Sequence, residues 1–348
     1  MKLNSAIAIA LATQSNAQQM LRFACSQLSV ERLDPLVDPG VPQTAHLHQI
    51  VGGNAFKPTM PTTTDLSKVA SCTTCTKQED FSNYWTAVMY FRARNGTYKR
   101  VPQMPNLHLE GQKGGMTIYY IPPYDGKSKT TAFKPGFRMI TGNPAARTKS
   151  VRPRELTFRC FGKNWSGDQG APGGGSDTDT FPKKPCLGGI RSNTYFPVCW
   201  DGKNLDSPNH SSHMAYPSGQ PNGGGPCPAT HPVRVPQLFY ETIWDTREFN
   251  NKEDWPADGS QPFVFSTGDN TGYGHHGDYM FGWKGDSLQR AMDARCGGNL
   301  GNYCPQLTNQ TYAAANACNV KQTVSESVDG WVKTMPGGVL AGDNDHHL

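Results

Sequence analysis

Histidine is the residue type that most suggests chemistry in this chain, because its ten copies are unevenly spread. Seven of them lie in or beside three short clusters: His46 and His48; His210 and His213, with His231 further on; and His275 and His276. Neutral imidazole is a common ligand of zinc and copper, and it also exchanges protons near neutral pH. The clusters therefore suggest either a metal site or a site of proton transfer.

The first cluster has the pattern His-x-His. In an extended segment, residues two apart point to the same face, so His46 and His48 can present both imidazoles to one metal or substrate. The alternative is a surface pair, or one histidine bonded to a nearby carbonyl oxygen. The glycines at positions 52 and 53 allow a close backbone approach in either case.

The second cluster combines histidine with carboxylates in a polar stretch. Asp201 and Asp206 precede His210 and His213, and the intervening DGKNLDSPN composition is typical of a loop. Either carboxylate could orient an imidazole or act as an acid/base group. Asn209 begins a glycosylation sequon here, and an attached glycan would instead indicate an exposed loop without a catalytic role.

The third cluster is rich in glycine and also contains acids. Asp269 and Asp278 flank His276, so the segment could place all three side chains against a ligand. Phe281 and Trp283 follow, and they either stack on sugar rings or lie buried in a core strand.

The elements that must position these side chains are mostly short strands. Runs rich in β-branched and aromatic residues, bounded by Gly, Pro, Asn or Asp, occur at 85–91, 116–121, 137–140, 156–160, 237–243 and 262–266. Helical periodicity is clear only at 287–295, and a second short helix is expected near 310–318. We therefore predict a mainly β fold, a single β-sandwich or jelly-roll-like domain with long loops and one or two short helices.

The N-terminal 17 residues predict a secretory signal peptide. Lys2 precedes a short apolar stretch, and the small residues SNA at 15–17 form a cleavage site, so the mature chain would start at Gln18. No later window approaches the roughly 20 apolar residues of a membrane helix. We expect a secreted, extracellular, monomeric protein with one domain over 18–320 and a variable C-terminal tail over 321–348.

Cysteine usage agrees with an oxidising compartment. The mature part has ten cysteines, an even number, so up to five disulfides are expected to tie the long loops. Cys72 and Cys75 are close enough to bridge each other in a tight turn. Zinc ligation by this CxxC is disfavoured, because no second Cys or His pair follows at finger-like spacing.

The charge distribution excludes one class of partner. The net charge of +5 is scattered and forms no basic stripe with interleaved aromatics, so no nucleic-acid binding is expected. Sequons at Asn95, Asn164, Asn209 and Asn309 are compatible with a secreted glycoprotein.

Several longer motifs resemble a known family, the secreted fungal proteins catalogued as domain of unknown function number nineteen ninety-six. The matching motifs are RLDPLVDPG (32–40), HLHQIVGG (46–53), CTTC (72–75), SNYW (82–85), GFRMI (136–140), CWDGKNLDSP (199–208), HMAYP (213–217), and HGDY (276–279) with Gly282 and Trp283. The resemblance covers about 23–296. Because some members are joined to cellulose-binding or wall-stress modules, it implies association with plant or fungal wall polysaccharide.

The resemblance also implies a set of functional residues. The positions that match the fixed polar pattern of the family are His46, His48, Arg138, Asp201, Asp206, His210, His213, Asp269, His276 and Asp278. His108 and His275 do not fall on such positions. Arg138 is a candidate clamp for an anionic group of the substrate.

Our hypothesis for the site is that His46, His48, His213 and His276 converge. They would hold copper or zinc, with Asp201 or Asp278 as supporting carboxylate or base. Without a metal, His48, His213, His276 and the carboxylates would act directly as acids and bases in hydrolysis or elimination. A copper site using the N-terminal amine and a histidine is excluded, because the expected mature terminus is Gln18.

Two classes of function remain open. The first is a polysaccharide-active hydrolase, lyase or metal-dependent enzyme. The second is a non-catalytic wall or glycan binding protein, whose aromatic side chains would form an exposed stacking surface. The aromatic residues proposed to contact substrate are Tyr84, Trp85, Tyr279 and Trp283. Clustered ionisable groups are costly to bury for packing alone, which favours the enzyme.

Overall fold

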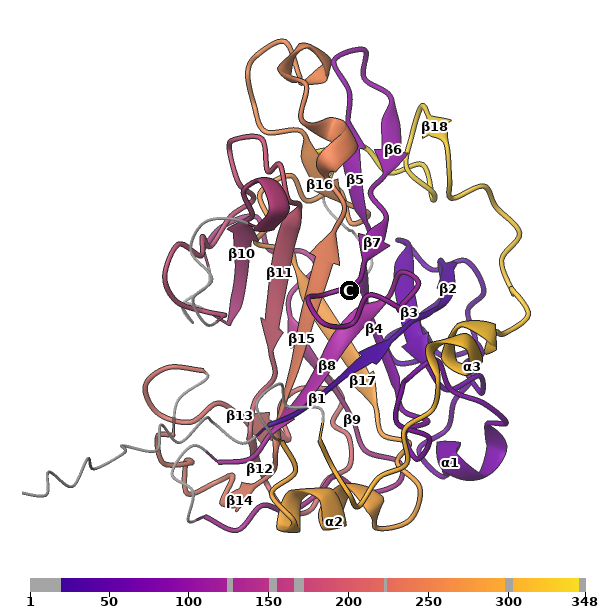
Figure 1. The fold of residues 1–348 in the computed structure, drawn as a ribbon, viewed down its shortest axis with the longest axis vertical. Coiled ribbons are helices and arrows are strands. Elements are labelled where there is room, and N and C mark those ends of the chain that lie inside the picture. Colours follow the sequence, from indigo (N-terminus) through magenta and orange to yellow (C-terminus); the bar gives the residue numbers. More distant parts are fainter. Residues whose placement is uncertain are drawn as a thin grey trace, which may run out of the picture.

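The computed structural model describes residues 20–123, 128–149, 155–165, 172–221, 224–297 and 303–343. Two antiparallel sheets pack face to face and form a sandwich, with smaller sheets at its ends (Figure 1). The predicted mainly β fold is confirmed. The predicted signal peptide lies outside the described residues.

The larger sheet, sheet 1, has five strands in one path. In spatial order these are β1 (Leu21–Cys25), β8 (Met116–Ile121), β15 (Gln237–Trp244), β11 (Ile190–Tyr195) and β10 (Leu156–Cys160). A short strand, β7 (Gln103–Met104), also pairs with β15. All of these pairings are antiparallel.

Sheet 2 carries the first and third histidine clusters. Its strands in spatial order are β2 (Gln27–Glu31), β3 (His48–Gly52), β4 (Asn83–Ala87), β17 (His276–Met280) and β9 (Arg138–Gly142). Strands β3 and β17 are far apart in the sequence, yet β4 alone separates them in the sheet (Figure 1).

Smaller elements complete the fold. One small sheet has the order β16 (Phe263–Phe265), β5 (Met89–Arg92), β6 (Tyr98–Arg100) and β18 (Trp331–Val332), and another has β13 (Met214–Ala215), β12 (Cys199–Trp200) and β14 (Val233–Arg234). The helices are α1 (Leu66–Val69), α2 (Ser287–Asp293) and α3 (Tyr312–Ala317), and short 3-10 turns lie at Lys163–Trp165, Arg247–Phe249 and Lys252–Asp254. Both predicted helices are present, and α1 is an additional single turn.

The core between the sheets is aromatic, and its hydroxyl groups bond to one another. Tyr120 of sheet 1 meets Tyr84 and Tyr279 of sheet 2, with oxygen to oxygen distances of 2.9 Å in both cases. Trp283 donates its indole N–H to Tyr120 at 3.0 Å. Buried tyrosine hydroxyls need such partners, so this network joins the two sheets without leaving polar groups unsatisfied.

All ten cysteines form disulfides, and the bridge between Cys72 and Cys75 that their spacing allows does not form. The bridges are Cys25–Cys75, Cys72–Cys318, Cys160–Cys186, Cys199–Cys227 and Cys296–Cys304. Cys72 and Cys75 do not pair with each other, because Cys75 lies opposite Cys25 in an isolated antiparallel bridge. Cys72 instead ties α3 to the body of the domain.

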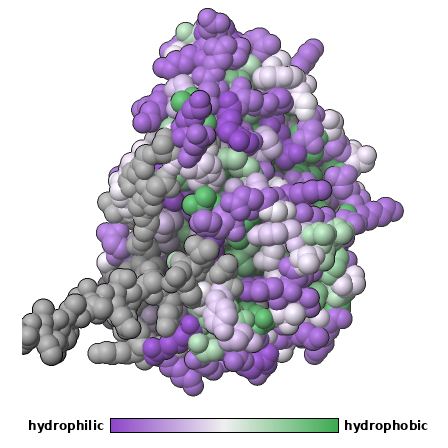
Figure 2. Space-filling view, viewed as in Figure 1, coloured by the Kyte–Doolittle hydropathy of each residue, from purple (hydrophilic) through white to green (hydrophobic). Residues whose placement is uncertain are grey.

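The expected C-terminal tail packs on the domain. From α3 the chain runs up one side of the molecule to β18 (yellow in Figure 1), and Val324 and Met335 are buried along it. The face in Figure 2 is largely hydrophilic with scattered apolar patches. Within the described ranges, no helix has the length and apolar character needed to cross a bilayer.

Candidate metal centre

Three imidazoles from two distant segments meet on the outer face of sheet 2. His276 Nε2 lies 3.4 Å from His46 Nε2 and 3.4 Å from His48 Nε2. The rings of His46 and His48 lie 4.3 Å apart between centroids. All three side chains are buried. The two imidazoles of His-x-His therefore reach one site as predicted, although His46 lies in a bend before β3 and not in a strand, and the third cluster supplies the third imidazole.

Strand register explains why His48 and His276 meet. His48 pairs with Ala87 of β4, and Asp278 pairs with Trp85. Because β4 and β17 are antiparallel, His276 falls opposite Ala87 as well. The two histidines therefore lie at the same level of the sheet, on either side of one residue of β4.

Gly142 lets the backbone approach His276 from the other side. It pairs with His276 in the β17 to β9 ladder and has a φ of +82°. A Cβ at this position would lie 2.3 Å from the carbonyl oxygen of His275 and 2.8 Å from the Cα of His276. Only glycine fits this combination of conformation and contact.

Two buried carboxylates border the imidazoles. Asp34 Oδ2 lies 3.9 Å from His48 Nε2, and Asp278 Oδ2 lies 3.6 Å from His276 Nε2. The other oxygen of Asp34 accepts hydrogen bonds from the amides of Leu36 and Val37, which fixes the carboxylate. Asp278 Oδ2 is buried and has no hydrogen-bond partner among the described residues.

Burial sets the protonation of these groups. It raises the pKa of Asp278 well above its usual value, and the charge of Asp34 raises it further. Burial also raises the pKa of Asp34, although its two amide bonds oppose the shift. The pKa of His48 is held well below 6.5, mainly by burial and also by the neighbouring His46 and His276. His48 is therefore neutral at physiological pH, the form that binds metals.

The spacing of the imidazoles fits a divalent ion. Two nitrogens bound to a tetrahedral zinc at about 2.0 Å lie about 3.3 Å apart, close to the two 3.4 Å distances. Ligand atoms of His46, His48 and His276 all lie within 4.8 Å of one another, and those of Asp34, His48 and Asp278 do the same. Three histidines with adjacent carboxylates form a donor set suited to zinc or copper.

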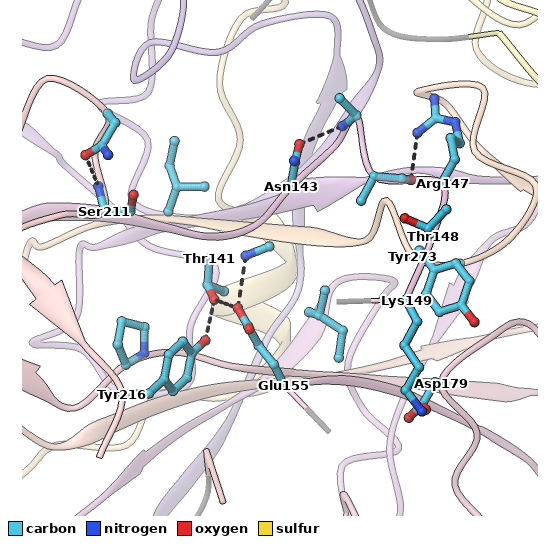
Figure 3. A pocket seen from close by; sticks show the side chains of 18 of the residues that line it. Thr141, Asn143, Arg147, Thr148, Lys149, Glu155, Asp179, Ser211, Tyr216 and Tyr273 are labelled. Carbon is cyan, nitrogen blue, oxygen red and sulfur yellow. Dashed lines mark hydrogen bonds and ion pairs between the residues drawn. The ribbon is translucent and has the colours of Figure 1, made fainter. Parts of the chain in front are cut away.

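The five groups lie in a cavity of about 300 Å³ that adjoins a larger cleft of about 640 Å³. The residues that line both spaces are Ile140, Gly142, Asn143, Asn209 and Ser211. Figure 3 shows the larger cleft, with Thr141, Glu155 and Tyr216 joined by hydrogen bonds and Lys149 directed at Asp179. The segment of the second histidine cluster therefore borders the site with Asn209 and Ser211, which line both spaces.

His213 does not join the other three histidines, which corrects the predicted four-histidine centre. Its Nδ1 lies 2.9 Å from Ser207 Oγ, and its Nε2 lies 2.9 Å from the carbonyl oxygen of Arg138. The ring also packs against Phe137. Both ring nitrogens are thus engaged within the protein, so His213 has a structural role.

His275 is likewise separate from the site. It lies 2.9 Å from Thr194 Oγ1 and stacks on Phe265 between the sheets. Burial lowers its pKa to about 3. Its neutral ring is part of the core.

The remaining polar candidates of the second cluster bond within their own loop. Asp201 accepts hydrogen bonds from the amides of Lys203 and Asn204, so it stabilises a turn away from the imidazoles. Asp206 contacts His210 at 2.7 Å and Arg138 at 3.9 Å. Arg138 is mostly buried beside Asp206 and is absent from the lining of both cavities.

The predicted stacking surface is also wrong. The side chains of Tyr84, Trp85, Tyr279 and Trp283 have 0% exposure, so none of them can contact a polymer from solution. Sheet 2 is covered on both faces, by sheet 1 on one and by loops and apolar side chains on the other. Tyr84 and Tyr279 therefore face the sandwich core, while Trp85 packs against Phe56.

Sequence reasoning missed Asp34 as a site residue. Its signal was present, because Asp34 lies in the RLDPLVDPG motif and precedes a turn. Asp34 precedes the two histidines by 12 and 14 positions, so spacing alone does not link it to them. Only the fold of the intervening loop brings its carboxylate to His48.

Comparison with known proteins identifies one family. No curated protein and no solved structure matches the chain. The segment 34–283 matches a family described as a domain of unknown function, DUF1996, and it contains all five groups of the centre. The chain belongs to this DUF1996 family.

Proposed function

We propose that this protein is a secreted, metal-dependent enzyme of hydrolase or lyase type that acts on plant or fungal wall polysaccharide. The observation that carries the proposal is the convergence of His46, His48 and His276 at 3.4 Å spacing beside the unpartnered oxygen of Asp278. Zinc and copper are the ions that this donor set suits best.

Charge balance supports a bound cation. The described lining of the smaller cavity contains Asp34, Asp38 and Asp278 but neither lysine nor arginine. Burying carboxylates without a positive partner is unfavourable, and a divalent ion would remove most of that cost.

The chemistry then divides among named groups. A bound ion supplies a Lewis acid that activates water or polarises a substrate oxygen. His46, His48 and His276 would hold it, and Asp34, whose Oδ2 lies 3.9 Å from His48 Nε2, would add a carboxylate ligand on the same side. Asp278 Oδ2, which makes no other described hydrogen bond, is placed to accept a proton beside His276.

The cleft supports a ligand rich in hydroxyl groups. Its labelled side chains in Figure 3 are mainly polar, and they include Thr141, Asn143, Ser211, Tyr216 and Tyr273. A polar cleft that continues from the ion cavity can hold a chain of sugars with one bond placed at the centre. The five disulfides and the predicted signal peptide support secretion.

A version without metal uses the same groups directly as acids and bases. A non-catalytic glycan-binding protein has less support, because the aromatic side chains expected on its surface are buried. The three versions differ in metal content and in turnover.

The test is elemental analysis of protein purified without chelator, followed by replacement of single histidines. We expect one equivalent of zinc or copper, and at least about 100-fold weaker binding in His276→Ala and His48→Ala. His213→Ala is the matched control and keeps the metal. Absence of stoichiometric metal after zinc or copper is added would overturn the metal centre.

Activity is tested separately on β-glucans, xylans, chitin and uronate polymers. New reducing ends indicate hydrolysis, and absorbance of unsaturated sugars indicates elimination. Loss of either signal in His276→Ala, with His213→Ala still active, supports the enzyme. Metal binding without any turnover on the panel would reject a polysaccharide-active enzyme and favour a binding role.

A further inference from the structure

We infer that the ion pair between Arg32 and Glu326 is a positioning device for the metal centre, through which the C-terminal segment holds the loop that carries Asp34 and His46. This inference rests on the proposed function. We call residues 321–343 the C-terminal clasp. The clasp lies outside the family match, which ends at residue 283.

Arg32 is the point where the clasp meets the loop. Its Nε lies 2.9 Å and 3.0 Å from the two carboxylate oxygens of Glu326. Its Nη1 donates to the carbonyl oxygen of Thr44 at 2.9 Å, and the Thr44 amide donates back to the Arg32 carbonyl at 3.0 Å. One guanidinium therefore closes the loop from 32 to 44 and attaches it to the clasp.

One group of the site, Asp34, lies inside the closed loop, and another, His46, follows directly after it. Asp34 follows Arg32 by two residues, and His46 follows Thr44 by two residues. A rotation of either loop end would move the Asp34 carboxylate or the His46 imidazole. The ion pair thus constrains both without touching either.

Two further contacts join the clasp to the residues around Asp34 and His46. Glu31, which pairs with His48 across β2 and β3, accepts hydrogen bonds from the amides of Thr323 at 2.6 Å and Val324 at 3.0 Å. A Cβ at Gly337 would lie 2.6 Å from the carbonyl oxygen of Ala45, so the clasp backbone lies directly on the residue before His46.

The end of the clasp reaches the loop that leads to His276. The Gly342 amide donates to the Gly268 carbonyl at 2.8 Å, and Arg147 joins the carbonyls of Asp343 and Thr267 at 2.7 Å and 2.9 Å. The clasp therefore contacts the chain before both strands that supply imidazoles. Ligand geometry at a metal depends on such supporting contacts, which commonly change affinity 10–100-fold.

The test compares Glu326→Gln with Asp329→Gln in the full-length protein. Asp329 makes a similar ion pair from the clasp to Arg100 of β6, away from the loop, and so controls for general weakening of the clasp. Zinc affinity is measured by competition with a chromophoric chelator. We expect about 10-fold weaker zinc binding in Glu326→Gln and no change in Asp329→Gln. The exchange Arg32→Glu with Glu326→Arg should recover part of the loss.

A second measurement does not depend on metal. Amide hydrogen exchange at 43–47 in the metal-free protein should accelerate in Glu326→Gln and not in Asp329→Gln. If the wild type binds no zinc, the proposed function fails, whereas the exchange experiment still decides the positioning role. Equal affinity and equal exchange in the two variants would overturn the inference, as would zinc affinity that falls only in step with the thermal midpoint.

Discussion

The two outer faces of the sandwich both bury charged side chains, but they balance them differently. On sheet 1, Asp177 contacts Arg159 and Arg191, and Glu241 contacts Arg191 at 3.2 Å. On sheet 2, Asp278 faces imidazoles and leaves one oxygen without a described partner. Carboxylates that already face guanidinium groups need no further cation, whereas a carboxylate that lacks a positive partner is suited to take an ion from solution.

The histidines show the same difference. His213 and His275 have partners from other elements of the fold and behave as polar core residues. His48 and His276 point their Nε2 atoms at each other across 3.4 Å. Histidine content alone therefore does not identify a site, and the partners of each ring nitrogen do.

The largest effect is expected when the arginine–carboxylate network of sheet 1 is broken. Asp177→Ala leaves Arg159 and Arg191 buried without one carboxylate, which should lower the free energy of unfolding by about 3–5 kcal/mol. Urea denaturation measures it. Asp245→Ala removes an exposed pair with Arg247 and should cost under about 1 kcal/mol. Equal losses of unfolding free energy in the two variants would show that the buried network stabilises the fold no more than the exposed ion pair does.

Asp80 tests a third case, in which a buried carboxylate has hydrogen-bond donors but no cationic partner among the described residues. Burial raises the pKa of Asp80 to about 7, while the Tyr84 hydroxyl at 2.6 Å and the Ser82 amide oppose the shift. A raised pKa stabilises the fold below the unfolded pKa, about 4, and this stability is lost as the pH rises through 7. Between pH 4 and pH 8 the wild type should lose about 4 kcal/mol more than Asp80→Asn. Parallel pH profiles of urea unfolding would contradict this.

His213→Ala tests whether a satisfied histidine is purely structural. It removes the imidazole that donates to the Arg138 carbonyl and one of the two side-chain contacts of Ser207 Oγ, so stability should fall by about 1–3 kcal/mol. Zinc stoichiometry, measured by elemental analysis, should stay unchanged. A variant that folds normally but no longer binds zinc would show that His213 contributes to the metal centre.

The smallest effect has the opposite sign. Burial raises the pKa of Asp278, so at pH 7 the metal-free protein must either protonate this carboxyl on folding or bury its charge. Asp278→Asn removes that cost, and the metal-free protein should become about 1 kcal/mol more stable at pH 7. In saturating zinc the order should reverse, because the wild type binds the ion more tightly. Thermal unfolding with chelator and with zinc measures both, and a variant less stable in both conditions would indicate that Asp278 is a structural carboxylate.

Local patterns predicted the elements better than the partners. The run 116–121 matches β8. The rings of His46 and His48 lie 4.3 Å apart, although His46 is in a bend before β3 and strand alternation does not apply to it. Trp85 is buried because loops cover the outer face of sheet 2. The alternation of strand side chains does not predict that cover. The partners of Cys72 and His213 depend on segments 246 and 75 residues away, which no local pattern reveals.

The wide separation of the site residues also bears on when the centre can form. His48 and His276 are 228 residues apart, and their strands β3 and β17 lie on either side of β4, so both strands must pair with β4 before the two imidazoles meet. Pairings between distant segments form slowly, because the chain loses the entropy of closing a long loop before it gains stabilising contacts. The metal would then bind after folding and would not direct it. Full metal affinity would therefore indicate that all strands of sheet 2 have paired.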